Sequence, residues 1–237
     1  MDLGLSGPFS HLRPAGELPG PNHVHFWLED FSGWDDPGPA DHDMLDPNEK
    51  ERAEKIRFPR DRRRYVLARR FIRTVCAAYL RVKPGEIRFS LGPYGKPRLV
   101  LPPTALDLRF NISHCGDILL AAFAVGREVG VDIETRERRL DVAGMSEICL
   151  SPEERKKLQG LSDAERLAAF LRNWTLKEAY TKAIGVGHQQ PFAEIEASLL
   201  VSDAPFVARK DNLVNWIAIE PDLDSLQGYA AAIVIER

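Results

Sequence analysis

Apolar positions in the first third of the chain recur at helical spacing. The repeat comprises six residues, Tyr65, Ala68, Ile72, Val75, Cys76 and Tyr79. It predicts a helix with one buried stripe, beginning at an N-cap on Asp61 and ending near Leu80, before Pro84. A shorter helical segment is predicted to begin at Asp46 and Pro47.

Alternating or continuous apolar runs elsewhere predict strands. These strands are expected at 23–28, 86–91, 98–101, 108–112, 118–125, 128–133, 195–200, 206–209, 214–219 and 229–235. We expect the strands 118–125 and 128–133 to be buried and joined by a tight turn. Ser151 and Pro152 have the form of a helix start, and a second pair of helices is predicted from there to Ile184, ended by Gly185.

One pattern, D-x-x-R-x-x-x-x-x-R, occurs in both helical blocks. It comprises Asp61, Arg64 and Arg70 in the first block and Asp163, Arg166 and Arg172 in the second. The repetition favours a duplicated half. Together with the mixture of helices and short strands, it predicts an α+β (α/β) fold.

Charge and composition narrow the classes of function. With 32 basic and 35 acidic residues the net charge is -3, so a whole-chain electrostatic attraction to nucleic acid or anionic membrane is not expected. No apolar run approaches the roughly 20 residues that span a bilayer, and the N-terminus lacks the pattern of a secretory signal, which predicts a cytoplasmic protein without a membrane partner. The widely separated Cys76, Cys115 and Cys149 are expected to be free thiols.

The sequence G-V-D-I-E at 130–134 places two carboxylates on one face of a predicted strand. Asp132 and Glu134 are two residues apart, so Val131 and Ile133 face the other way. Two neighbouring acids repel each other unless a cation lies between them, and Mg²⁺ accepts one or two carboxylates together with water and phosphate oxygens. The alternative is an acidic, solvated strand face.

A second motif places Trp174, Glu178 and Lys182 four residues apart on one face of a helix. A third acid would lie one turn from a lysine, which supplies a metal ligand beside a counter-charge for phosphate. A solvated i,i+4 ion pair is the alternative. A third motif ends a strand with Ser113 and His114, whose hydroxyl and imidazole are candidate donors to phosphate. For His114 a purely structural role is the alternative.

The segment Lys50 to Arg73 is strongly basic, with 11 basic and 3 acidic residues. A solvated helix face explains much of this charge. Nucleic-acid binding is the rival, but the segment lacks the interleaved exposed aromatic residues of a stacking surface, and a small polyanion fits as well.

These motifs, in this order and spacing, closely resemble the 4'-phosphopantetheinyl transferases of the monomeric surfactin-synthetase-activating type. The resemblance rests on F-N-I-S-H-C-G at 110–116, G-V-D-I-E at 130–134 and W-T-L-K-E-A-Y-T-K-A-I-G-V-G at 174–187, supported by Y-G-K-P at 94–97 and S-P-E-E at 151–154. It covers about 46–192. Cys115 stands where serine is common and His188 where leucine is frequent, and neither departure removes a charged group.

The resemblance implies transfer of the 4'-phosphopantetheine arm of coenzyme A to a serine of an acyl or peptidyl carrier protein, which is an acidic helical bundle. Adenosine 3',5'-bisphosphate is released. Asp132, Glu134 and Glu178 would hold Mg²⁺ or Mn²⁺. Lys182 and His114 would contact the pyrophosphate.

Further site residues are implied in the same way. Arg52 would meet the 3'-phosphate of coenzyme A, Lys96 and Pro97 would line its nucleotide side, and Lys177 would contact phosphate. The general base is left open among Glu154, Glu178 and a metal-bound water. For Glu154 the alternative is an acid that the helix dipole favours in a first turn.

The resemblance also implies the domain organisation. A flexible leader, residues 1–21, would precede two pseudo-twofold-related halves, 22–125 and 126–237, each a small, mainly antiparallel sheet packed with a long helix. A chain carrying both halves would be a monomer. Two other functions stay open: a Mg²⁺-dependent phosphodiesterase or nuclease, and a non-enzymatic nucleic-acid-binding module that uses 50–73.

Overall fold

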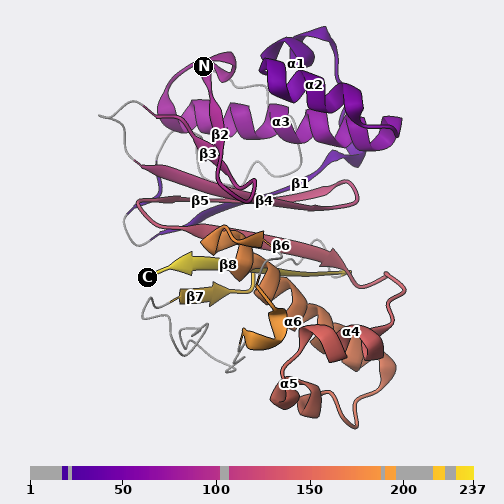
Figure 1. Ribbon diagram of the computed structural model, residues 1–237. Helices are drawn as coiled ribbons and strands as arrows, with labels where there is room; N and C mark the ends of the chain where they lie inside the picture. Colours follow the sequence, from indigo (N-terminus) through magenta and orange to yellow (C-terminus); the bar gives the residue numbers. More distant parts are fainter. Residues whose placement is uncertain (1–17, 21–22, 102–106, 188–189, 196–215, 222–227) are drawn as a thin grey trace. The chain divides into compact units, whose positions relative to one another are not determined.

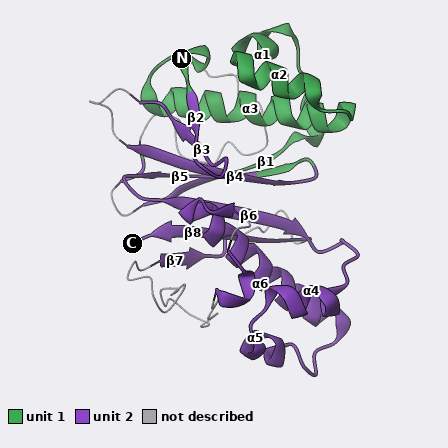
Figure 2. Ribbon diagram, viewed as in Figure 1, with its two compact units in different colours: residues 1–18, 27–88, 117–119 green, residues 19–26, 89–116, 120–237 purple. Residues whose placement is uncertain are grey.

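The computed structural model describes residues 18–20, 23–101, 107–187, 190–195, 216–221 and 228–237 of the 237-residue chain. The chain divides into two compact units (Figure 2). Unit 1 contains 27–88 and 117–119, and unit 2 contains 89–116 and the described residues from 120 onward. Helices and short antiparallel strands occur together, which confirms the α+β class. The units do not coincide with the two predicted halves of the sequence, because 89–116 groups with unit 2.

Unit 1 is built around the 22-residue helix α3 (Pro59–Leu80), shown in Figure 1. The predicted stripe is buried, except that Tyr65 is only half-buried. Trp27, on strand β1 (His25–Asp30), packs edge-on against Phe71 with ring centroids 6.1 Å apart, and its indole N–H donates to the Tyr79 hydroxyl at 3.3 Å. The stripe therefore forms the apolar core of this unit.

The start of α3 differs from the prediction. Pro59 is the first helical residue and Phe58 is the N-cap, so Asp61 lies inside the first turn. Proline is favoured at the first position because its missing N–H would have no partner there, and an acid is favoured in the first turn by the helix dipole. The prediction that Asp61 caps the helix was wrong.

Helix α2 (Pro47–Lys55) begins where predicted, and its N-cap Asp46 accepts a hydrogen bond from the backbone of Glu49. The guanidinium of Arg73 on α3 is fully buried and lies 2.5 Å from Glu49 and 3.1 Å from Asp46. A buried arginine needs such partners, because an unpaired charge in the interior is strongly destabilising. Three short helical elements complete this part of the chain, namely η1 (Phe31–Gly33), α1 (Pro39–Met44) and η2 (Pro84–Glu86).

Much of the basic segment 50–73 is neutralised within unit 1. Six of its arginines are in ion pairs with carboxylates: Arg60 and Arg64 with Asp117, Arg63 with Asp36, Arg69 and Arg73 with Glu49, and Arg70 with Asp41. Positive charge held by protein carboxylates is less available to nucleic acid. This pairing disfavours the nucleic-acid-binding alternative.

Unit 2 contains an antiparallel sheet of order β6-β8-β7, made of β6 (Val129–Thr135), β8 (Tyr229–Glu236) and β7 (Trp216–Ile219). The 22-residue helix α6 (Asp163–Ile184) packs against β6 and β8 (Figure 1). Its end is as predicted, with Gly185 left-handed at φ 73°. Helices α4 (Val142–Cys149) and α5 (Pro152–Lys157) precede α6, and η4 (Phe192–Glu194) follows it.

The remaining strands are β2 (Phe89–Leu91), β3 (Pro97–Leu99), β4 (Leu108–Cys115) and β5 (Ile118–Val125). β2 and β3 form an antiparallel pair, and β4 and β5 belong with β1 to a sheet of order β1-β5-β4. The predicted strands 118–125 and 128–133 are confirmed as β5 and β6. They belong to different sheets, because β6 pairs with β8.

Two of the predicted strands, 195–200 and 206–209, lie almost wholly outside the described residues, as does the predicted leader. The predicted strand 86–91 begins only at Phe89, because 84–86 is a short 3-10 turn. In the part of the chain that the structure describes, no helix is both long and apolar enough to cross a membrane.

Candidate active site

Strand β6 directs its two acidic side chains toward helix α6. Gly130, Asp132 and Glu134 alternate with Val131 and Ile133, which are almost fully buried on the other face. A β-carbon on Gly130 would collide with the backbone of Ala179 and Ala183 on α6. The face that carries the acids is therefore the face against which α6 packs, and the solvated-strand alternative does not apply.

Asp132 lies at the centre of a polar cluster formed by β4, β6 and α6. It is 4% exposed, and its Oδ1 accepts hydrogen bonds from Lys182 Nζ at 2.6 Å and Ser113 Oγ at 2.8 Å. Lys182 Nζ also lies 3.0 Å from Ser113 Oγ. The other oxygen, Oδ2, is buried without a hydrogen-bond partner among the described residues. The structure thus brings together three predicted site residues and leaves one buried carboxylate oxygen unsatisfied.

Glu134 is half-buried at the end of the same strand face. Burial raises its pKa, and the negative charge of Asp132 raises it further. Arg138 at 3.4 Å, a hydrogen bond from the Trp174 side chain, and Lys182 act in the opposite direction. The influence of Asp132 on Glu134 is the like-charge repulsion that a divalent cation would relieve.

Glu178 is buried on α6, one turn before Lys182. Among the described residues, no group of three or more His, Cys, Asp and Glu side chains is positioned to hold a metal ion. A complete protein cage is not required for Mg²⁺, which keeps water and substrate phosphate oxygens as ligands. The unsatisfied Asp132 Oδ2 and its like-charged neighbour fit such an open site.

His114 does not join this cluster. It follows Ser113 on β4, so the alternation of the strand directs it to the opposite face, where it is exposed. No hydrogen bond or ion pair of its side chain occurs among the described residues. Its assignment to the pyrophosphate stays a prediction.

Lys96 has its ammonium fully engaged by protein acceptors. Nζ donates to Glu128 at 2.7 Å and to the carbonyls of Val129 at 3.2 Å and Ala183 at 2.7 Å. Burial lowers the pKa of Lys96, and Glu128 partly offsets this. Lys96 thereby connects the β2–β3 hairpin to β6 and to the last turn of α6. Pro97, the first residue of β3, lines with it a cavity of about 80 Å³.

Lys177 and Glu154 form a buried ion pair. Their charged atoms are 2.5 Å apart, and the two side chains are 0% and 6% exposed. Burial lowers the pKa of Lys177, and Glu154 partly offsets this. Glu154 also accepts a hydrogen bond from the backbone of Ser151 at 2.8 Å, completing a capping box at the start of α5.

Arg52 lies in unit 1, exposed on α2. Its guanidinium lies over the ring of Tyr65, 5.5 Å from the centroid, and that of Arg69 lies over the same ring at 5.6 Å. The assignment of Arg52 to the 3'-phosphate stays a prediction.

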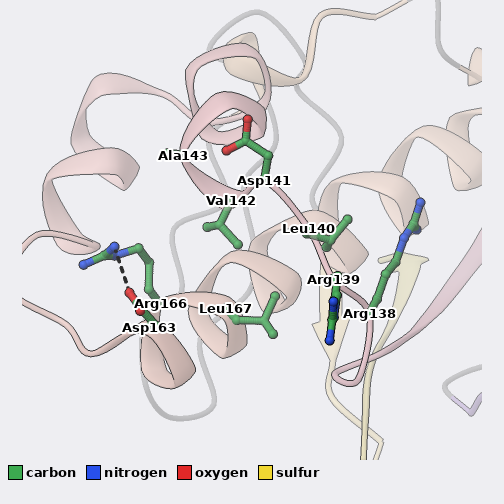
Figure 3. Close-up of a pocket in the computed structure, with 9 residues that line it drawn as sticks. All are labelled: Arg138, Arg139, Leu140, Asp141, Val142, Ala143, Asp163, Arg166 and Leu167. Carbon is green, nitrogen blue, oxygen red and sulfur yellow. Dashed lines mark hydrogen bonds and ion pairs between the residues drawn. The ribbon is translucent and has the colours of Figure 1, made fainter.

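A basic pocket adjoins the acidic strand end (Figure 3). Its volume is about 560 Å³, and it is lined by Arg138, Arg139, Leu140, Asp141, Val142, Ala143, Asp163, Arg166 and Leu167. Figure 3 shows Arg138 and Arg139 on one side and Arg166 on the other, with Leu140, Val142 and Leu167 between them. Arg138 joins the pocket to the site through its contact with Glu134.

Two parts of this arrangement were not predicted. Asn111 Oδ1 accepts the backbone N–H of Val131 at 2.9 Å and so attaches β4 to β6 beside the site. Gly130 permits the close approach of α6. A glycine at the start of a buried, β-branched strand is the signal that could have indicated such an approach.

Comparisons with known proteins show to which family the chain belongs. A family model described as "4'-phosphopantetheinyl transferase superfamily" matches residues 128–234, and one described as "4'-phosphopantetheinyl transferase, N-terminal" matches 39–125. The 4'-phosphopantetheinyl transferase HetI of Nostoc sp. is 32% identical over 190 residues, which cover 79% of this chain and 78% of HetI. The 4'-phosphopantetheinyl transferase Sfp of Bacillus subtilis is 29% identical over 157 residues, covering 66% of this chain and 67% of Sfp.

Among solved structures, a holo-(acyl-carrier-protein) synthase from Bacillus anthracis matches 46% of this chain and 94% of its own, with 22% identity and a TM-score of 0.37. The sequence relationships carry the conclusion. The chain belongs to the 4'-phosphopantetheinyl transferase superfamily. A transferase of this type moves the 4'-phosphopantetheine arm of coenzyme A to a carrier protein.

Proposed function

We propose that this transferase acts through a magnesium site formed by Asp132, Glu134 and Glu178, with Lys182 beside it. The observation that carries the proposal is that the two oxygens of the Asp132 carboxylate differ in their partners. One oxygen is held by Lys182 and Ser113, and the other is buried without a partner among the described residues. Such an orphaned oxygen costs free energy unless a ligand binds it.

In the reaction, a carrier serine oxygen forms a bond to the phosphorus that bears the pantetheine arm, and the bond from that phosphorus to the bridging oxygen breaks. Bound Mg²⁺ supplies neutralisation of pyrophosphate charge. Lys182, whose side chain is 28% exposed, reaches both Asp132 and solvent and is placed to stabilise charge on the leaving bisphosphate. Glu178 is the better candidate to accept the serine proton, since Glu154 is engaged by Lys177.

The partner's docking surface is the finer part of the proposal. We infer that an acidic carrier protein docks at the pocket of Arg138, Arg139 and Arg166. The lining also holds Asp163, which pairs with Arg166, and Asp141, which caps α4, so three arginines face two acids around an apolar floor. The remaining positive charge and this floor suit an acidic helix with apolar residues between its charges. The contact between Arg138 and Glu134 makes this pocket continuous with the proposed reaction site.

The test is the mass of a carrier protein incubated with coenzyme A, Mg²⁺ and this chain. We expect an increase of one phosphopantetheine, and Asp132→Asn should slow it by about 100-fold or more while the protein stays folded. Glu153→Gln, which changes an exposed acid on α5 of the same unit, is the matched control. A near-normal rate for Asp132→Asn would refute the site, and an unmodified carrier would refute the function.

A further inference from the structure

The ion pair between Lys177 and Glu154 connects four segments of unit 2. Lys177 Nζ, on α6, donates to Glu154 on α5, to the carbonyl of Cys149 at 2.9 Å, and to the carbonyl of Phe192 at 3.0 Å. These partners belong to the end of α4, the first turn of α5 and the start of η4. One ammonium therefore fixes three elements to the middle of α6.

All three proton donors of this ammonium are used. An ammonium has three N–H groups, and the structure gives Lys177 three acceptors inside the protein. Its side chain is 0% exposed, so binding a phosphate would require the group to leave those acceptors and cross packed protein. Such a lysine is poorly placed to contact a substrate.

The carboxylate of Glu154 is likewise bound to partners inside the protein. One of its oxygens accepts from both Lys177 and the backbone of Ser151, and its side chain is 6% exposed. A general base must come within hydrogen-bond reach of the proton it removes. Reaching a carrier serine would break the ion pair and uncap α5, leaving a buried, unpaired ammonium.

We infer that Glu154 and Lys177 are positioning residues that hold the turn of α6 bearing Glu178 and Lys182, rather than a base and a phosphate ligand. Lys177 immediately precedes Glu178 and lies five residues before Lys182 on the same helix. Anchoring α6 at this point fixes the rotation of the helix about its axis. It thereby fixes the direction in which Glu178 and Lys182 point, and sub-ångström placement of such groups matters for catalysis.

The experiment uses neutral replacements of similar shape: Glu154→Gln, Lys177→Met and the two combined. Each single change leaves one buried charge unpaired and should lower both the melting temperature, by roughly 10 °C, and kcat, by about 10-fold or more, at a temperature where the protein is fully folded. The combined variant leaves no buried charge and should be more active than either single variant. The KM for coenzyme A should stay within about 2-fold throughout.

Asp132→Asn combined with Lys182→Met is the matched control. It neutralises the ion pair that Lys182, also on α6, forms with Asp132 on β6. We expect no recovery there. A combined Glu154→Gln and Lys177→Met variant as inactive as Glu154→Gln alone would make Glu154 a base and overturn the inference. A 10-fold rise in KM for coenzyme A in Lys177→Met would make Lys177 a ligand and also overturn it.

The activity readout rests on the proposed function, but the two can fail separately. An inactive wild-type chain would refute the proposed function and leave the melting temperatures to test the ion pair. If a single variant does not fold, coenzyme A binding and kcat of the combined variant alone still decide the question. A combined variant with a higher kcat than the single variants supports the positioning role. A combined variant that is inactive but has the melting temperature of the wild type overturns it.

Discussion

Gly130 shows how one residue lets an acidic strand face pack closely against a helix inside a protein. Two acids on a buried strand face a helix at close range only if the backbones can approach each other, and a side chain on Gly130 would collide with the backbone of Ala179 and Ala183. The first residue of G-V-D-I-E is therefore a packing residue, and it leaves room on the same strand face for Asp132 and Glu134, the two acids of the proposed magnesium site. The motif combines both requirements on one strand face.

Replacing Gly130 with alanine should destabilise the protein by about 3 kcal/mol or more. The added carbon meets backbone atoms, which cannot move aside as a flexible side chain can, so α6 must shift away from β6. Urea denaturation measures the change in the free energy of unfolding. Gly85→Ala is the control, because no atom lies within 4 Å of a β-carbon built there. Equal stabilities of the two variants would contradict this account of the helix packing.

At the scale of elements, α3 is fixed by a carboxylate outside it. Asp117 accepts from Arg64 at 2.7 Å and from Arg60 at 3.1 Å, within unit 1. Arg64 above all, together with Arg60, lowers the pKa of Asp117 from 3.8 to about 2. The lowered pKa means that the folded protein favours the charged carboxylate, so the pair stabilises the fold wherever Asp117 is ionised.

Asp117→Asn should therefore lower the free energy of unfolding by about 2 kcal/mol at pH 7. The folded pKa lies below the unfolded value, so the stabilisation is complete above about pH 5 and is lost as the pH falls from about 4 to about 2. Urea denaturation at pH 7 and at pH 2 should show the gap between variant and wild type closing. Asp163→Asn, which breaks the exposed pair with Arg166, should change stability by less than about 0.5 kcal/mol at either pH. A pH-independent gap for Asp117→Asn would contradict the pairing.

Elements whose ends have a local chemical cause were predictable from the sequence. The helix starts at Asp46–Pro47 and at Ser151 and the helix end at Gly185 are each determined by nearby residues, and they were found where expected. Asp61 was misassigned because aspartate is favoured both as an N-cap and in the first turn of a helix, and here Pro59 takes the first helical position. Strand partners could not be predicted, because pairing β6 with β8 joins segments about a hundred residues apart, which local patterns do not encode.

For the whole molecule, the part of the candidate site that could be predicted is the part in which the spacing of residues along one element places their side chains together. Asp132 and Glu134 share a strand face through alternation, and the resemblance added Lys182. The engagement of Lys96 and Lys177 by protein carbonyls was not predictable, since those acceptors come from other elements. A lysine next to an acid on a helix has the same sequence pattern whether its ammonium faces a substrate or the protein interior, and only packing distinguishes the two.

Docking of an acidic carrier depends on local charge, because the chain as a whole carries a net charge of -3 and would repel it. In the proposed docking pocket, Arg138 and Arg166 contact Glu134 and Asp163, so Arg139 supplies most of the local attraction. Arg139 is the best single test: it is exposed, and no ion pair of its side chain occurs among the described residues. Arg138 is less suitable, since it also contacts Glu134.

Arg139→Glu should raise the KM for the carrier protein by about 10-fold and leave the KM for coenzyme A unchanged. Charge at the edge of an interface governs encounter, and salt screens it with a Debye length of about 8 Å at physiological ionic strength. The wild-type KM for the carrier should therefore rise with added salt, and that of the variant should rise less. Lys157→Glu makes the same charge change at an exposed residue of α5 and should have little effect. Equal effects of the two variants would mean that net charge, rather than this pocket, controls docking.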